Sequence, residues 1–88
     1  MGQPQVLMYT TDWCPYCSRA RKLLAAKQVS FEEVDIDAAP GKRAEMQTRS
    51  GRSSVPQIFI GERHVGGSDD LAALDAAGKL DALLGKDR

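Results

Sequence analysis

Cys14 and Cys17 are the residues of this chain whose type and spacing point most directly to chemistry. They are the only cysteines among 88 residues, and they lie three positions apart. A C-x-x-C pair at the junction of a strand and a helix is typical of thiol–disulfide exchange. We therefore predict that the two sulfurs form a redox pair that alternates between dithiol and disulfide.

The elements around the pair distinguish the two sulfurs. The run Val6–Tyr9 predicts a strand, and apolar residues three and four positions apart predict a helix from about Pro15 to Lys27. Proline suits the first helical position, so Cys14 falls at the helix N-terminus, where free N–H groups and the helix dipole stabilise a thiolate. Cys17 lies one turn further on the same face. Cys14 is thus the predicted nucleophile and Cys17 the resolving thiol.

Two structural roles for the cysteines are less favourable. A structural zinc site needs four ligands, and His64 is the only histidine, so we expect no metal site. A permanent disulfide closing so short a loop would add little stability. His64 itself is predicted to be a solvated residue of a hairpin, because the sequence offers it no acid–base partner.

Length and composition predict one globular domain, residues 1–88, and we expect this domain to be a monomer. Twelve basic and twelve acidic residues cancel, and hydrophobic residues make up 42% of the chain. This balance argues against nucleic acid as a partner. No apolar stretch is long enough to span a membrane, and residues 1–5 lack the features of a secretory signal. Reactive thiols without an export signal predict a cytoplasmic location.

The remaining pattern predicts the order β-α-β-α-β-β-α. A helix between the first two strands favours a parallel crossover, and Gly61-Glu62 suits a two-residue hairpin turn. In the second helix we expect Ala44 and Met46 to be buried. The expected strands are Val6–Tyr9, 31–36, Gln57–Ile60 and Arg63–Val65, and the expected helices are 15–27, 41–50 and one that runs from Asp69 past Gly78 to Leu84.

Three motifs make the chain similar to a glutaredoxin from end to end. They are Cys14-Pro15-Tyr16-Cys17, Val55-Pro56 and the segment Gly66-Gly67-Ser68-Asp69-Asp70-Leu71. Together they resemble the small dithiol class found in bacteria, and the element order resembles the thioredoxin arrangement. The resemblance implies an α/β, thioredoxin-like fold with a four-stranded mixed sheet flanked by helices.

The resemblance also implies an enzyme, a glutathione-dependent thiol–disulfide oxidoreductase. It would reduce protein–glutathione mixed disulfides and protein disulfides, with glutathione as the reducing co-substrate and ribonucleotide reductase as one candidate partner. Two related functions are alternatives. A carrier of iron–sulfur clusters usually lacks the Pro15-Tyr16 pair, and a protein reduced by thioredoxin reductase replaces the Gly67–Asp70 segment.

The implied glutathione-binding residues are Tyr16, Arg43, Val55, Pro56, Ser68 and Asp69. Val55 would pair with the backbone of the ligand, and Pro56 would follow a cis peptide bond. Ser68 and Asp69 would hold the γ-glutamyl end at a helix N-terminus, although both also suit an ordinary helix cap. Trp13 would either contact protein substrates or pack against the loop after Pro56.

One position departs from the family. Glutaredoxins commonly carry a lysine three positions before the nucleophile, where this chain has Thr11. That lysine helps to bind the glycine carboxylate of glutathione. The resemblance points to Arg43 as the compensation, because it aligns with the position in the second helix from which the family reaches the same carboxylate, and a guanidinium can hold a carboxylate through two hydrogen bonds. The alternative for Arg43 is an ordinary solvated charge, and Arg49 and Arg52 are the next candidates.

Overall fold

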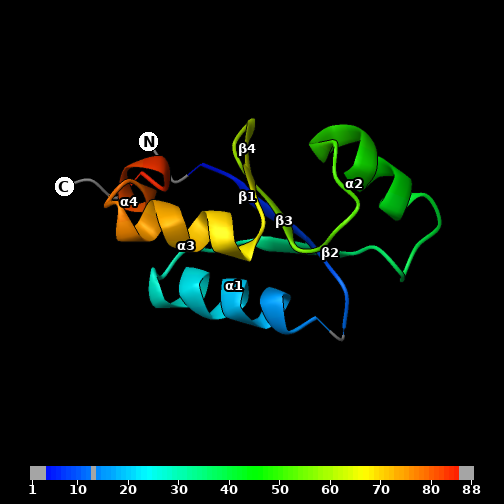
Figure 1. The fold of residues 1–88 in the computed structure, drawn as a ribbon, viewed down its shortest axis with the longest axis horizontal. Coiled ribbons are helices and arrows are strands. Elements are labelled where there is room, and N and C mark those ends of the chain that lie inside the picture. The colour runs from blue at the N-terminus through cyan, green and yellow to red at the C-terminus, as the bar shows by residue number, and fades with distance from the viewer. Residues whose placement is uncertain (1–3, 13, 86–88) are drawn as a thin grey trace.

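A four-stranded sheet forms the centre of the protein (Figure 1). The computed structural model describes residues 4–12 and 14–85. The strand order of the sheet is β2-β1-β3-β4. β1 runs parallel to β2 and antiparallel to β3, and β4 is antiparallel to β3, so the mixed sheet and the parallel crossover are confirmed. The strands are β1 (Val6–Thr10), β2 (Glu32–Asp35), β3 (Gln57–Ile60) and β4 (Arg63–Gly66).

Helices cover both faces of the sheet. Figure 1 shows α1 and α3 side by side on one face and α2 on the other. The helices are α1 (Pro15–Ala26), α2 (Lys42–Ser50), α3 (Ser68–Ala76) and α4 (Leu80–Leu83). No helix in the described ranges is both long enough and apolar enough to cross a membrane.

Alternation along the strands divides the core in two, because successive side chains of a strand point to opposite faces. Met8 and Ile58 belong to the cluster under α1, α3 and α4. Tyr9 and Phe59, their neighbours in sequence, pack with Met46 under α2. Ala44 of α2 is exposed, so its predicted burial is wrong; only one face of this helix meets the sheet.

The last predicted helix is divided in the structure, which corrects the continuous helix expected past Gly78. Gly78 has a φ of +75°, which favours glycine. Its N–H donates to the Asp75 carbonyl (3.0 Å), and the Lys79 N–H donates to the Leu74 carbonyl (2.9 Å), the two bonds that end a helix in a Schellman motif. Leu80 after the break is fully buried in the core.

Candidate functional site

Cys14 is the N-cap residue of α1, as predicted from the strand-to-helix boundary. Its backbone is extended (φ −95°, ψ 113°), and Pro15 occupies the first turn of the helix. The sulfur of Cys14 accepts a hydrogen bond from the Cys17 N–H at 3.3 Å. This is one of the N–H groups at the helix start that have no carbonyl partner within the helix, so the position suits a sulfur that carries negative charge.

Cys17 is the buried member of the pair, whereas Cys14 is partly exposed, and both are free thiols. Burial is the largest cause that raises the pKa of Cys17. A hydrogen bond from the Thr11 backbone lowers this pKa and the adjacent Cys14 sulfur raises it, and the net result is a pKa of about 11. Cys17 therefore remains a protonated thiol at neutral pH. The two sulfurs differ in solvent access, with Cys14 the one that a substrate can reach.

The peptide before Pro56 lies beside Cys14. The Val55–Pro56 bond is cis, as the resemblance implied. β3 lies next to β1 in the sheet, which brings the start of β3 close to the end of β1. The Cys14 thiol consequently lies within hydrogen-bonding distance of the Val55 carbonyl, with the sulfur 3.6 Å from the oxygen.

A pocket of about 250 Å³ lies between the start of α1, the loop before β3 and the start of α3. Five of the six residues that the resemblance assigned to glutathione line it together: Tyr16, Val55, Pro56, Ser68 and Asp69. Tyr16 is half exposed, and its ring forms one wall. A second pocket of about 250 Å³, between β2 and α2, shares no lining residue with this one.

Arg43 does not line this pocket, and the structure gives it another partner. Its guanidinium is 2.8 Å from the Asp37 carboxylate, and both side chains are more than half exposed. The cation that does line the pocket is Arg52, in the loop between α2 and β3. The role of Arg43 towards a ligand remains a prediction.

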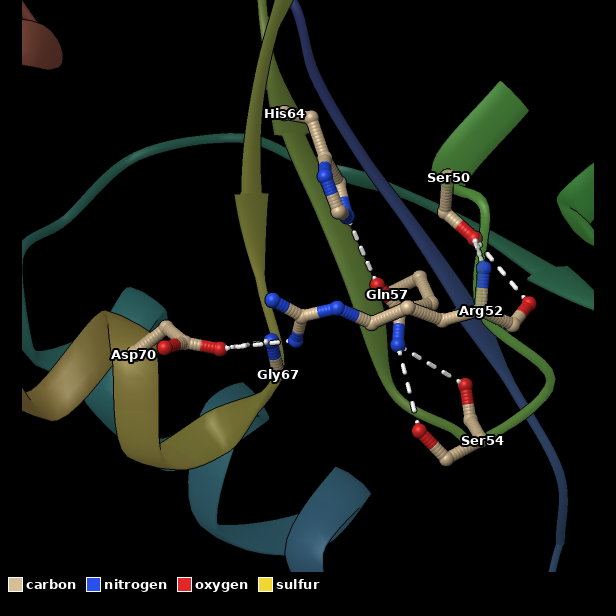
Figure 2. Close-up of polar contacts among 7 residues, drawn as sticks. All are labelled: Ser50, Arg52, Ser54, Gln57, His64, Gly67 and Asp70. Atoms are coloured by element: carbon tan, nitrogen blue, oxygen red, sulfur yellow. Dashed lines mark hydrogen bonds and ion pairs between the residues drawn. The ribbon is translucent and has the colours of Figure 1, made fainter.

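Asp70, which the sequence did not single out, joins two walls of the pocket (Figure 2). Its carboxylate accepts the Gly67 N–H at 2.9 Å and pairs with Arg52 at 3.1 Å. These two contacts hold the pKa of Asp70 below its usual range. The capping role considered for Ser68 and Asp69 thus belongs to Asp70. An acidic residue three positions after Gly67 was the sequence signal that could have predicted this cap.

His64 is not the solvated residue predicted for the hairpin. Its ring is half buried, lies 4.9 Å from the Phe59 ring between centroids, and is 2.7 Å from the Gln57 side-chain oxygen. Burial lowers the pKa of His64, and the positive charge of Arg52 lowers it further. The sequence signal that could have predicted a partner for His64 was Gln57, a polar residue at the first position of an otherwise apolar strand.

The described part of the chain contains no group of three or more His, Cys, Asp or Glu side chains placed to hold a metal ion. Trp13, for which the sequence left two roles open, lies outside the described residues, as do residues 1–3 and 86–88 at the ends.

Comparison with known proteins places this site in a family. The sequence model of the glutaredoxin family matches residues 6–65. A glutaredoxin of Pseudomonas aeruginosa is 59% identical over 81 residues, which cover 92% of this chain and 96% of that protein.

Solved structures agree with this assignment. The solution structure of a glutaredoxin from Brucella melitensis is similar with a TM-score of 0.85 and 56% identity, covering 98% of this chain and 94% of that one. A buckwheat glutaredoxin in complex with glutathione has a TM-score of 0.86 and 28% identity, covering 96% and 78%. The fold is therefore thioredoxin-like, and the chain, with its Cys14 and Cys17 pair, belongs to the glutaredoxin family of thiol–disulfide oxidoreductases.

Proposed function

We propose that this protein reduces protein–glutathione mixed disulfides and protein disulfides, with glutathione as the electron donor. The observation that carries the proposal is the position of the Cys14 sulfur, 3.6 Å from the Val55 carbonyl beside a pocket lined by Tyr16, Pro56 and the start of α3. The similar buckwheat protein was solved in complex with glutathione, which supports the same ligand here.

We assign each part of glutathione a counterpart in this pocket or near it. The backbone of Val55 would pair with the cysteinyl part and direct its sulfur towards Cys14. The first turn of α3, at Ser68 and Asp69, offers N–H groups to the γ-glutamyl carboxylate, and the Asp69 carboxylate would hold the ammonium group. The glycine carboxylate then needs a cation, for which Arg43 and Arg52 are the candidates.

In the monothiol route, the Cys14 thiolate attacks the glutathione sulfur of a protein–glutathione disulfide. The Cys14–glutathione disulfide forms as the old disulfide breaks, and the protein thiolate leaves and takes up a proton. A second glutathione thiolate then attacks the glutathione sulfur on Cys14. Oxidised glutathione is released and Cys14 returns to its thiolate. In the net change, one free glutathione and the protein–glutathione disulfide give the protein thiol and oxidised glutathione.

In the dithiol route, Cys14 opens a protein disulfide and forms a mixed disulfide with one of its sulfurs. Cys17 loses its proton, attacks Cys14 and releases the reduced protein, leaving a Cys14–Cys17 disulfide that two glutathiones reduce. Because the pKa of Cys17 is about 11, its thiolate is scarce at neutral pH.

The proposed partners are glutathione and proteins that carry glutathionylated cysteines or reducible disulfides, with ribonucleotide reductase as one candidate substrate. We propose a monomer in the cytoplasm, where a reducing environment keeps both thiols in the free state.

A coupled assay tests the proposal. Purified protein is given a small glutathione mixed disulfide with glutathione, glutathione reductase and NADPH, and the loss of NADPH is followed. The wild type should turn over, Cys17→Ser should retain this activity, and Cys14→Ser should have none. Turnover that requires thioredoxin reductase in place of glutathione would refute the proposed electron donor.

A further inference from the structure

Gln57 is a fully buried polar side chain at the first position of β3, a strand that is otherwise apolar. Its amide nitrogen donates to the Ser54 carbonyl at 3.0 Å and to the Ser54 hydroxyl at 3.3 Å. Its amide oxygen is 2.7 Å from Nε2 of His64 (Figure 2). A buried amide without partners would cost about 1–3 kcal/mol, so these contacts are needed for the side chain to be buried here.

The chemistry of the partners fixes which way each group points. The Ser54 carbonyl can only accept a hydrogen bond, so the amide nitrogen of Gln57 must face it. The amide oxygen of Gln57 then faces His64, and Nε2 of that ring must carry a hydrogen. A directed series of hydrogen bonds thus runs from His64 through Gln57 to Ser54.

His64 is itself held in place. Its ring lies against Phe59, with an interplanar angle of 35°. The pairing of β3 with β4 shifts register between Ile58 and Phe59, an irregularity that can redirect side chains. Arg52 and Asp70 are the charged groups whose fields act on the ring. Nε2 carries a hydrogen in both the neutral and the protonated ring, so the bond to Gln57 does not depend on pH.

The series ends at the wall of the pocket. Ser54 and Val55 both line it, and the carbonyl of Val55 lies beside the Cys14 sulfur. Ser54 is exposed and belongs to the loop between α2 and β3, so its peptide gains few packing contacts of its own. The hydrogen bonds from Gln57 therefore constrain the peptide between Ser54 and Val55, and Val55 is the residue that would pair with the ligand.

We propose that His64 and Gln57 are positioning residues for glutathione, acting through the hydrogen bonds that fix the backbone of Ser54 and Val55 against the pocket. The inference rests on the proposed function, because the pocket is taken to bind the glutathione part of the substrate. His64 and Gln57 do not contact the ligand; they set the direction of the backbone groups that do.

Two substitutions of His64 separate the hydrogen bond from the packing of the ring. His64→Phe keeps a ring against Phe59 and removes the donor, whereas His64→Gln removes the ring and offers an amide N–H at about the position of Nε2. In the coupled assay, His64→Phe should raise KM for the glutathione mixed disulfide by about fivefold, equivalent to ~1 kcal/mol. Its kcat should change little, and His64→Gln should restore most of KM.

Arg63→Gln is the matched control, because Arg63 is an exposed neighbour of His64 on β4. Its KM should equal that of the wild type. Thermal unfolding of every variant separates loss of stability from loss of positioning. If His64→Phe does not fold, His64→Leu, which also removes the donor, takes its place: its KM should rise by a similar factor while His64→Gln stays close to the wild-type value.

The outcomes distinguish the two levels of the proposal. A wild type that fails to use glutathione would overturn the proposed function and this inference with it. A wild type that uses glutathione, combined with an unchanged KM in His64→Phe or a KM in His64→Gln as high as in His64→Phe, would overturn the positioning role alone.

Discussion

Gly66 should be among the least replaceable residues of the protein, and Gly66→Ala tests the arrangement at the start of α3. Gly66 has a φ of +116°, a conformation that residues with side chains rarely adopt. A Cβ placed there would overlap the carboxylate oxygen of Asp70, lie 2.9 Å from its Cγ and lie 3.2 Å from Nη1 of Arg52. Asp70 would have to move, and its bonds to the Gly67 N–H and to Arg52 would be lost.

The cost can be estimated from these parts. The positive φ costs an alanine about 1–2 kcal/mol. Losing the bond between the Asp70 carboxylate and the Gly67 N–H costs ~1 kcal/mol, as for a helix cap. The ion pair with Arg52, whose side chains are about half exposed, adds at most ~0.5 kcal/mol. Gly66→Ala should therefore lower the free energy of unfolding by about 3 kcal/mol.

A double-mutant cycle with Asp70→Ala measures the part that depends on the carboxylate. Once the Asp70 side chain is absent, Gly66→Ala should cost only its backbone term, so the two single costs should exceed the double cost by ~1 kcal/mol in urea unfolding. The pKa of Asp70 is lowered in the folded protein. Its stabilising effect is thus present above the ordinary carboxyl pKa and is lost as pH falls, so the coupling should shrink in acid. Additive costs at neutral pH would refute the proposed clash.

Three further predictions follow from particular contacts. The pKa of Cys17 is raised to about 11, mainly by burial, so in the reduced protein the folded state keeps a proton that the unfolded chain releases at lower pH. The free energy of unfolding of the reduced protein should therefore fall by ~2 kcal/mol as pH rises from the ordinary thiol range towards 11. The same measurement on Cys17→Ala should lack this part of the fall. Arg52→Ala should raise KM for glutathione several-fold, in line with ~1 kcal/mol for an exposed charge-assisted contact. This increase should be larger than the increase caused by Arg43→Ala. A larger increase for Arg43→Ala in the coupled assay would assign the glycine carboxylate to Arg43. Tyr9 is fully buried and its hydroxyl is 2.6 Å from the Glu45 carboxylate, so Tyr9→Phe should cost about 1–2 kcal/mol in urea unfolding, and Glu45→Gln, which keeps an acceptor, should cost less.

Local patterns in the sequence were sufficient for most elements and for the position of Cys14 at the start of α1. Successive residues of a strand face opposite sides of a sheet, so position along the chain alone separates Ile58 from Phe59, and these two do lie in different clusters. Pro15 after Cys14 predicted where α1 begins. These features depend on neighbours along the chain, because strand alternation, helix spacing and the first helical turn are local properties. The cis bond at Pro56 was expected from the family motif, and the structure confirms it.

Contacts between distant segments were decided only by the tertiary structure. Arg43 and Arg52 are both exposed arginines close together in sequence, yet one pairs with Asp37 and the other lines the pocket. Their partners depend on how the α2–β3 connection lies against α3, which no local pattern specifies. For the same reason His64 appeared to be a surface residue, because its partner Gln57 is reached only when β4 folds back along β3. Side-chain pairing at such sites is set by the register of the sheet and the packing of helices on it, and these are properties of the whole fold.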